Sequence, residues 1–380
     1  MAAADEAERM LPRQNPDLAG QEQAERVLLD AYRSGRLPHA WLISGPRGIG
    51  KATLAYRFAR FVLSETSGGA GGGPGGGLFG APLPPESMAV AATSPIFRKV
   101  AAGSHPDLFI VERRYDEKAG RLKTEIVVPD VQGLGNFLHL TPAEGGWRVV
   151  VVDSADDMNR HAANAILKLI EEPPKRSLIL LVSHAPGGLL PTIRSRCRKL
   201  VLKPLDETTL SELLARHRPE LDVDERRVLA RLAEGSIGRA LDLSDAGGVE
   251  LYRELIELLG SLPRLNAGDV HALADRLGRR GQEQAFTTLA ELLTWWLSRA
   301  LAASAAGKAP ADVIEGDGGL ALRLMAGRSG TQRSGGAGLD RWLDLWDKLT
   351  RLIVRAEGAN LDRKQVILNA MLGLEAAARH

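Results

Sequence analysis

The stretch SGPRGIGKAT, Ser44–Thr53, decides the fold, because it fits the phosphate-loop pattern Gly-x-x-x-x-Gly-Lys with Gly45, Gly50 and Lys51 in register. The apolar segment AWLIS (Ala40–Ser44) leads into it and predicts a buried strand. The segment KATLAYRFARFVL follows it, and its apolar residues recur at helical spacing. Strand, glycine-rich loop and helix in this order predict a turn whose backbone N–H groups and helix N-terminus attract phosphate oxygens.

Two positions of the predicted site depart from those of a working ATPase. A Ser or Thr hydroxyl directly after the lysine binds Mg²⁺, but this chain has Ala52 there, and Thr53 is rotated by about 100° around the helix. The apolar segment RVVVVD predicts a second buried strand that ends at Asp153, a residue type that holds Mg²⁺ through water. Ser154 then stands where ATPases of this kind carry a glutamate that polarises the attacking water. These residues predict negligible ATP hydrolysis by the chain itself.

The predicted nucleotide-binding residues are the loop and the aspartate: Gly45, Pro46, Arg47, Gly48, Ile49, Gly50, Lys51, Ala52, Thr53 and Asp153. The loop backbone and Lys51 can still contact phosphates, so weakly bound ATP or ADP is one interpretation. A vestigial loop that only shapes the turn is the other. Asp156 and Asp157 lie past the end of the strand and are not expected to replace the missing glutamate.

Strands and helices alternate through the first half of the chain. The segments SLILLVS (Ser177–Ser183) and RKLVLKPL (Arg198–Leu205) predict two more strands. Before them, NRHAANAILKLIEEPP predicts a helix that is capped by Asn159 and ended by Pro173. This alternation predicts an α/β domain with a parallel sheet over residues 1–203.

A glycine- and proline-rich segment, 67–85, interrupts this domain and predicts a flexible surface insertion. Beyond residue 203 the pattern is helical, with a small unit over 204–246 and a larger one over 247–380. The glycine-rich stretch 327–338 predicts a loop. Two stripes predict helix–helix core: Leu292, Trp295, Trp296 and Arg299, and Leu339, Trp342, Leu343, Trp346, Leu349 and Ile353.

Composition narrows the class of protein. The net charge is only +2, so an interface for nucleic acid would have to be a local patch. Cys197 is the one cysteine, which excludes an intrachain disulfide and any zinc site that needs two cysteines. The start MAAADEAERM is acidic and unlike a secretory signal, and no apolar run approaches the roughly 20 residues that span a bilayer. We therefore expect a cytoplasmic protein without a membrane partner.

Several segments together resemble the bacterial clamp-loader subunits of DNA polymerase III, and most of all the delta-prime group. They are GRLPHAWLISGPRGIGKAT, HPDL, LTPAEGGWRVVVVDSADDMNRHAANAILKLIEEPP and TIRSRCRKL. The resemblance is strong from Gly20 to about Pro204 and weak beyond. It implies an α/β AAA+ (RecA-like P-loop) domain with a parallel sheet, a small α-helical lid and an α-helical collar domain that joins five subunits in an open ring.

The resemblance also implies partners and a role. The partners would be motor (gamma/tau-like) and delta subunits, with the sliding clamp and primed DNA reached through the complex. Ser195, Arg196 and Cys197 match a motif whose arginine reaches the ATP of the neighbouring subunit, where a planar, permanently charged guanidinium suits the γ-phosphate. An ordinary surface salt bridge is the alternative for Arg196. Cys197 is expected to be a small buried apolar residue rather than a reactive thiol.

Two departures from the family pattern matter. Many relatives carry a four-cysteine zinc module, but this chain has no cysteine there, so we predict no zinc, no other metal, and a local turn contact for His105. The lid of the motor subunits carries a nucleotide-sensing arginine where GSIGRAL has Gly238, and Arg239 is one residue late and turned away. We therefore expect a stator subunit of the polymerase holoenzyme without ATPase activity of its own. The alternatives are an active motor subunit and a non-catalytic interaction scaffold.

Overall fold

The computed structural model describes residues 10–67, 85–116, 121–144, 146–326, 335–359 and 361–379. The chain divides into two compact units. The first comprises Met1–Leu213 with Gly235–Gly238, and the second comprises Leu214–Glu234 with Arg239–His380. In the described part of the chain, no helix is long and apolar enough to cross a membrane. The predicted insertion falls almost entirely on residues 68–84, which lie outside the described residues.

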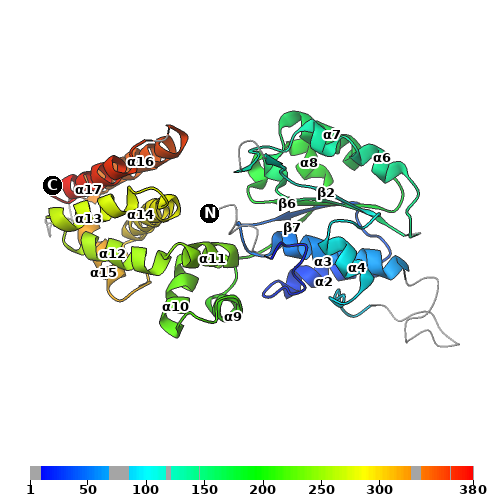
Figure 1. Cartoon of the computed structure of the whole chain (residues 1–380), viewed down its shortest axis with the longest axis horizontal. Coiled ribbons are helices and arrows are strands. Elements are labelled where there is room, and N and C mark those ends of the chain that lie inside the picture. The colour runs from blue at the N-terminus through cyan, green and yellow to red at the C-terminus, as the bar shows by residue number, and fades with distance from the viewer. Residues whose placement is uncertain are drawn as a thin grey trace. The chain divides into compact units, whose positions relative to one another are not determined.

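A five-stranded parallel sheet forms the centre of the first unit, in the order β2-β5-β6-β1-β7 (Figure 1). Its strands are β1 (Ala40–Ser44), β2 (Leu108–Val111), β5 (Arg148–Val152), β6 (Ser177–Ser183) and β7 (Arg198–Val201). Strands β1, β5 and β6 are buried along their whole length, as their continuous apolar runs predicted. Because all five strands are parallel, the loops that follow β1, β5 and β6 emerge at the same edge of the sheet. This edge carries the candidate site.

Helices cover both faces of the sheet, because alternate strand residues point to opposite sides. Trp41 and Ile43 pack into one apolar cluster with α2 (Glu22–Arg33), α3 (Lys51–Ser67) and α4 (Pro95–Ala101). Ala40 and Leu42 pack into the other cluster, on the face of the remaining helices (Figure 1). Those helices are α5 (Val128–Val131), α6 (Leu134–His139), α7 (Arg160–Glu171) and α8 (Pro191–Arg196). A small antiparallel pair, β3 (Tyr115–Asp116) and β4 (Arg121–Leu122), lies apart from this sheet.

Helix α7 has the boundaries that its sequence predicted. The Asn159 side chain accepts a hydrogen bond from the N–H of Ala162 at 3.0 Å and caps the first turn. Ile166 and Ile170 are buried one turn apart on the face that meets the sheet. The helix ends before Pro173, so the carboxylate of Glu171 lies at its C-terminus.

The described part of the second unit is helical. Its helices are α10 (Val223–Leu232), α12 (Gly248–Gly260), α13 (Ala267–Leu277), α14 (Glu283–Ala305), α15 (Asp317–Ala326), α16 (Gly335–Ala359) and α17 (Arg363–Arg379). Two more helices, α9 (Glu207–His217) and α11 (Ile237–Asp245), cross the division between the units. Trp296 and Trp342 are buried, as the predicted core stripes required, whereas Trp295 and Trp346 are half-buried.

Two predictions for this region are wrong in part. Leu343 is 44% exposed, because the buried face of α16 runs through Trp342, Leu345 and Leu349 and residue 343 points about 100° away from it. The predicted loop over 327–338 is shorter, because α16 begins at Gly335. Glycine is tolerated at a helix end, because its unfavourable helix propensity is small compared with the free energy that the rest of the helix gains by packing. Residues 327–334 lie outside the described residues.

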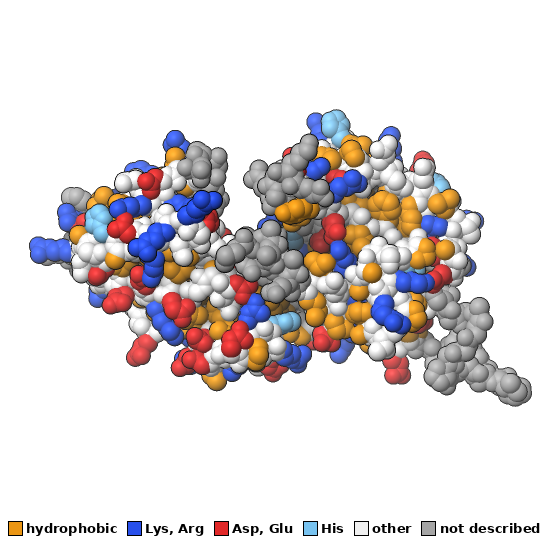
Figure 2. Space-filling model, in the orientation of Figure 1, with side chains coloured by type: hydrophobic (Ala, Val, Ile, Leu, Met, Phe, Trp, Pro, Cys, Tyr) orange, Lys and Arg blue, Asp and Glu red, His pale blue; other side chains and the backbone are white. Residues whose placement is uncertain are grey.

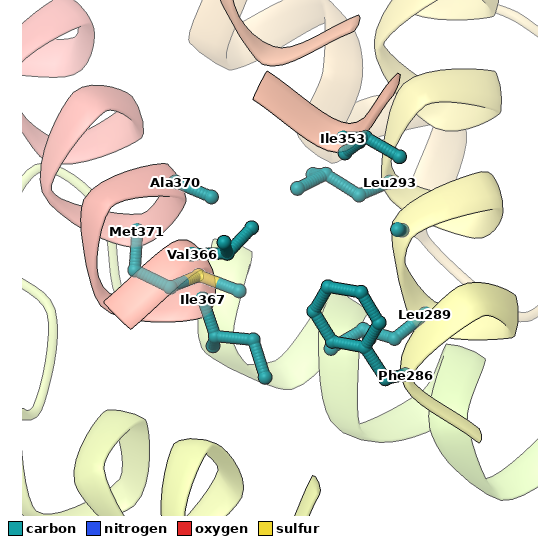
Figure 3. Close-up of a pocket in the computed structure, with 9 residues that line it drawn as sticks. Phe286, Leu289, Leu293, Ile353, Val366, Ile367, Ala370 and Met371 are labelled. Atoms are coloured by element: carbon teal, nitrogen blue, oxygen red, sulfur yellow. The ribbon is translucent and has the colours of Figure 1, made fainter. Parts of the chain in front are cut away.

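A hollow remains where α14, α16 and α17 meet. It has a volume of about 310 Å³, including a part open to solvent, and Figure 3 shows Phe286, Leu293, Ile353 and Met371 around it. Its lining is almost wholly apolar. A pocket without polar groups has nothing to orient a ligand, so we regard it as a gap in the packing of these helices.

Candidate functional site

The loop between β1 and α3 has the form of a phosphate cradle. Gly45, Gly48 and Gly50 have φ angles of 144°, 72° and 94°, which side chains rarely adopt. Within the part of the chain that the structure describes, the backbone N–H groups of residues 48–51 donate to no protein acceptor. Free N–H groups at the start of a helix fit the oxygens of a phosphate group.

Lys51 is turned inward to its own loop. Its ammonium donates a hydrogen bond to the carbonyl oxygen of Pro46, and the residue is only 3% exposed. Burial lowers its pKa to about 8, although the carboxylates of Asp156 and Asp153 act in the opposite direction. The amine is therefore mostly protonated at pH 7. It would have to leave the Pro46 carbonyl in order to contact a phosphate.

The magnesium half of an ATPase site is incomplete. Ala52 offers a methyl group that packs against the core, where a hydroxyl ligand is required. Asp153 directly follows β5, which ends one residue earlier than predicted. Burial raises the pKa of its carboxyl to about 6, and the nearby charge of Glu112 adds to this effect while Lys51 opposes it. At pH 7 this carboxyl is still mostly ionised, but position 52 offers no hydroxyl to bind Mg²⁺ beside it. The residues therefore fit a phosphate group better than a magnesium–nucleotide complex.

Ser154 belongs to a polar network that joins the ends of β5 and β6. It has a φ angle of 62°, in the left-handed region, and its hydroxyl is hydrogen-bonded to Nε2 of His184 at 3.1 Å. The carboxylate of Asp156 accepts from the Ser183 hydroxyl at 2.7 Å and from the backbone N–H of His184. Both carboxylate oxygens of Asp156 are thus bonded to the end of β6, and its inability to replace the missing glutamate stays a prediction.

His184 is a site residue that sequence reasoning missed. Burial lowers its pKa to about 4, and Lys51 and Arg47 act in the same direction. The imidazole is therefore neutral at pH 7. The signal that could have found it is its position directly after a buried strand, at the edge of the sheet where Asp153 and Ser154 also lie.

Gly48 and Gly238 meet backbone to backbone. The N–H of Gly238 donates to the carbonyl oxygen of Gly48 at 3.1 Å. A Cβ atom built on Gly238 would lie 2.9 Å from the Cα of Gly48, closer than real Cβ contacts come. We call this contact the glycine junction. It explains why no side chain stands at position 238.

Arg239 has partners of its own within the second unit. Its guanidinium lies 3.5 Å from the carboxylate of Glu234 and 5.9 Å from the ring centroid of Trp295. An ion pair and an aromatic face together hold the side chain. Its contacts are therefore structural ones.

Arg196 lies at the end of α8 with its side chain 43% exposed. One terminal nitrogen is 2.9 Å from the carboxylate of Glu171, and the other donates to the carbonyl oxygen of Thr192 at 3.4 Å. Cys197, the next residue, is buried, and burial raises the pKa of its thiol to about 11, as expected for an unreactive apolar residue.

Known proteins resemble the chain over these same elements. The family model for the DNA polymerase III delta subunit matches residues 84–206. The delta′ subunit of Escherichia coli (strain K12) is 31% identical over 275 residues, which cover 72% of this chain and 73% of that protein. The chain belongs to the DNA polymerase III clamp-loader family. The delta′ subunit of Pseudomonas aeruginosa is 35% identical over 220 residues, and the tau subunit of E. coli is 32% identical over 247 residues.

The match to some clamp-loader relatives is partial. It covers 58% of this chain and 60% of the Pseudomonas delta′ subunit, and 63% of this chain but only 34% of the E. coli tau subunit. Among solved structures, a DNA polymerase III gamma subunit-related protein from Thermotoga maritima aligns over 93% of this chain and 100% of its own at 18% identity. Its TM-score of 0.39 is too low to support a structural argument.

The predicted fold class is confirmed for this clamp-loader chain. It has an AAA+ P-loop domain with a five-stranded parallel sheet, and a helical C-terminal part follows. The boundaries predicted between the AAA+ domain, lid and collar, at residues 203 and 246, stay predictions.

His105 makes a contact within its own turn. Its Nδ1 accepts a hydrogen bond from the N–H of Asp107 at 3.2 Å, which is the predicted local turn contact. Among the described residues, there is no group of three or more His, Cys, Asp or Glu side chains that could hold a metal ion. The absence of zinc stays a prediction.

Proposed function

We propose that this chain is a delta-prime-like stator subunit of the DNA polymerase III clamp loader. It would not hydrolyse ATP itself, and it would supply Arg196 as a trans-acting arginine finger to the ATP of a neighbouring motor subunit. One combination of features carries the proposal: the chain's own site has Ala52 and Ser154 where catalysis needs a hydroxyl and a glutamate, yet Arg196 is kept and half-exposed at the end of a helix.

The proposed chemistry is electrostatic. Negative charge on the transferred phosphoryl oxygens is stabilised by a guanidinium placed against them, and this needs no proton transfer from the arginine. The planar guanidinium holds its N–H donors in a fixed geometry that matches the phosphate oxygens, whereas a lysine ammonium has no such fixed geometry.

The proposed partners follow from the relatives. Proteins named delta′ and tau subunits of DNA polymerase III resemble this chain, so we propose that it assembles with gamma/tau-like motor subunits and a delta subunit. Through that complex it would help to load the sliding clamp onto primed DNA in replication.

The chain's own phosphate loop would hold nucleotide weakly if at all. The N–H groups of residues 48–51 and the ammonium of Lys51 would contact the phosphates of ATP or ADP, and such a ligand would stabilise the fold without being turned over. Calorimetry with ATP and ADP, on the natural chain and on Lys51→Ala, measures this affinity.

An active motor subunit is the main rival, and the 32% identity with the E. coli tau subunit favours it. The purified chain separates the two proposals. We expect ATP hydrolysis far below the turnover of about 1–10³ s⁻¹ that is typical of enzymes. Turnover in that range, from a preparation free of other clamp-loader subunits, would establish the rival.

Arg196→Ala in the reconstituted complex tests the arginine finger. We expect assembly at unchanged stoichiometry, with a loss of clamp- and DNA-stimulated ATPase activity and of clamp loading. Arginine fingers contribute on the order of 10³–10⁵ in rate at the site that they serve, and the loss for the whole complex is smaller because other sites remain active. Arg196→Lys should restore little.

Arg194→Ala is the matched control, because it removes a neighbouring cation from the same helix. It should leave both activities near those of the unmodified complex. If Arg196→Ala complexes load clamps at the unmodified rate, the scaffold interpretation replaces the arginine finger.

A further inference from the structure

The guanidinium of Arg196 is held by its own chain. Helices α7 and α8 pack against each other (Figure 1). The Arg196 side chain contacts the last residue of α7 and the backbone of α8. Glu171 contacts one terminal nitrogen, and the Thr192 carbonyl contacts the other. Both contacts occupy N–H groups on the terminal nitrogens, which a guanidinium uses to donate hydrogen bonds to a carboxylate or a phosphate.

Glu171 is the last residue of α7, which is an unfavourable place for an acidic side chain. The helix dipole is negative at its C-terminus and repels a carboxylate there. The same end attracts a cation, so the carboxylate and the helix terminus act together on Arg196. Because the ion pair is the contact that offsets the repulsion, Glu171 is suited to hold the arginine.

We propose that Glu171 is a positioning residue for Arg196, which it holds against this chain until the phosphate of a nucleotide on the neighbouring subunit displaces it. This inference rests on the proposed arginine finger. The Glu171 carboxylate and the phosphate compete for the same N–H groups of Arg196. The neighbour's ATP therefore binds more weakly than it would without Glu171, by a factor equal to the equilibrium constant of the Glu171–Arg196 contact.

The size of this factor follows from exposure. The side chains of Glu171 and Arg196 are 40% and 43% exposed. An exposed ion pair changes such an equilibrium by up to about fivefold, which corresponds to ~1 kcal/mol. The contact is therefore strong enough to set the arginine's resting position and weak enough to be exchanged within a catalytic cycle.

The test uses Glu171→Gln in the reconstituted complex, with clamp- and DNA-stimulated ATPase activity measured against ATP concentration. The ATPase activity that is lost in Arg196→Ala complexes is the part of the total activity that depends on this arginine, and we call it the Arg196-dependent share. In Glu171→Gln complexes we expect the KM for ATP of the Arg196-dependent share to fall about two- to fivefold. Its kcat should stay close to that of the unmodified complex. Salt should diminish the difference, because ions screen an exposed pair.

Two variants control the result. Glu172→Gln removes the adjacent charge, for which the structure gives no contact with Arg196, and should leave KM unchanged. Glu171→Asp keeps the charge and should move KM back toward that of the unmodified complex. A merely structural role for Glu171 would lower assembly or kcat and would not produce this pattern.

The double variant Glu171→Gln with Arg196→Ala separates competition from a general effect of charge. Glu171→Gln should change nothing once the arginine is absent. The inference is overturned if Glu171→Gln leaves KM unchanged, raises it, or lowers it equally in the Arg196→Ala background. If Arg196→Ala alone changes no activity, the proposed function itself fails, which is a different result.

Discussion

Asp153 and Lys51 are two groups of the candidate site whose pKa values are shifted so that the neutral form is favoured. Burial raises the pKa of Asp153 to about 6 and lowers that of Lys51 to about 8. The native state therefore binds a proton at Asp153 more tightly than the unfolded chain does. It follows that the stability contributed by this carboxyl decreases as the pH rises from about 4 through about 6, and is constant above that.

Asp153→Asn should stabilise the folded chain near pH 8, because an amide cannot ionise. A pKa shift of about 2 units sets an upper limit of about 3 kcal/mol, and we expect about 1–3 kcal/mol. The gain should diminish as the pH falls from 7 toward 4. Urea unfolding at pH 5 and pH 8 measures the difference.

Asp30→Asn is the control, because Asp30 is an exposed carboxylate of the same unit. Its effect on the free energy of unfolding should be small at both pH values. Lower stability of Asp153→Asn at pH 8 would contradict the argument, because it would mean that the ionised carboxylate stabilises the fold.

Individual residues were predictable where the reason is local. The Asn159 cap was predicted from its neighbours in the sequence, and the burial of Cys197 from the usual behaviour of a free cysteine. The inward turn of Lys51 and the bond between Ser154 and His184 were not, because they depend on groups that come together only in the folded sheet. Side-chain direction is set by contacts across space, which a sequence pattern does not encode.

Secondary-structure elements were predictable to within a few residues in the first unit. β1 and β6 have the predicted bounds, because a continuous apolar run between polar residues marks a strand buried on both faces. β7 ends at Val201, short of the predicted Leu205. In α16 the predicted apolar stripe included the exposed Leu343, because one apolar residue off the buried face is common and the pattern alone cannot reject it.

The glycine junction gives a prediction about two elements at once. Gly238→Ala lies in α11, where alanine alone would favour the helix by about 1 kcal/mol. We expect destabilisation by about 1–3 kcal/mol instead, because the new Cβ meets the backbone of Gly48, which cannot move as a side chain can. Chemical denaturation measures this change.

Gly187→Ala serves as the matched control, because a Cβ there meets nothing within 4 Å. It should change the free energy of unfolding little. If Gly238→Ala is the more stable of the two variants, the contact has more room than the structure shows.

The whole chain contains a segment whose composition sets it apart from both units. Residues 67–85 are rich in glycine and proline, and they run from the end of α3 at Ser67 to Pro85, whose carbonyl accepts a hydrogen bond from Arg33. Deleting 68–84 and rejoining the ends with a short linker keeps both of these anchors. We expect the melting temperature to change by less than about 3 °C, the shift that about 1 kcal/mol produces in a protein of this size.

Thermal unfolding followed by circular dichroism measures this shift. A control that replaces the same seventeen positions by a glycine–serine linker of equal length separates chain length from composition. A fall of more than about 5 °C in both variants would mean that the segment itself contributes to stability, whereas a fall in the shortened chain alone would mean only that the shorter connection strains the fold.

The glycine junction also bears on how such a chain can evolve. A side chain at position 48 or at position 238 is accommodated only if the facing backbone withdraws. Ala52→Ser and Ser154→Glu would restore the hydroxyl and the glutamate, yet an arginine at 238 would still meet Gly48. An arginine at 238 would therefore need a backbone change in the phosphate loop, so the proposed lack of ATPase activity would have a backbone cause as well as side-chain causes.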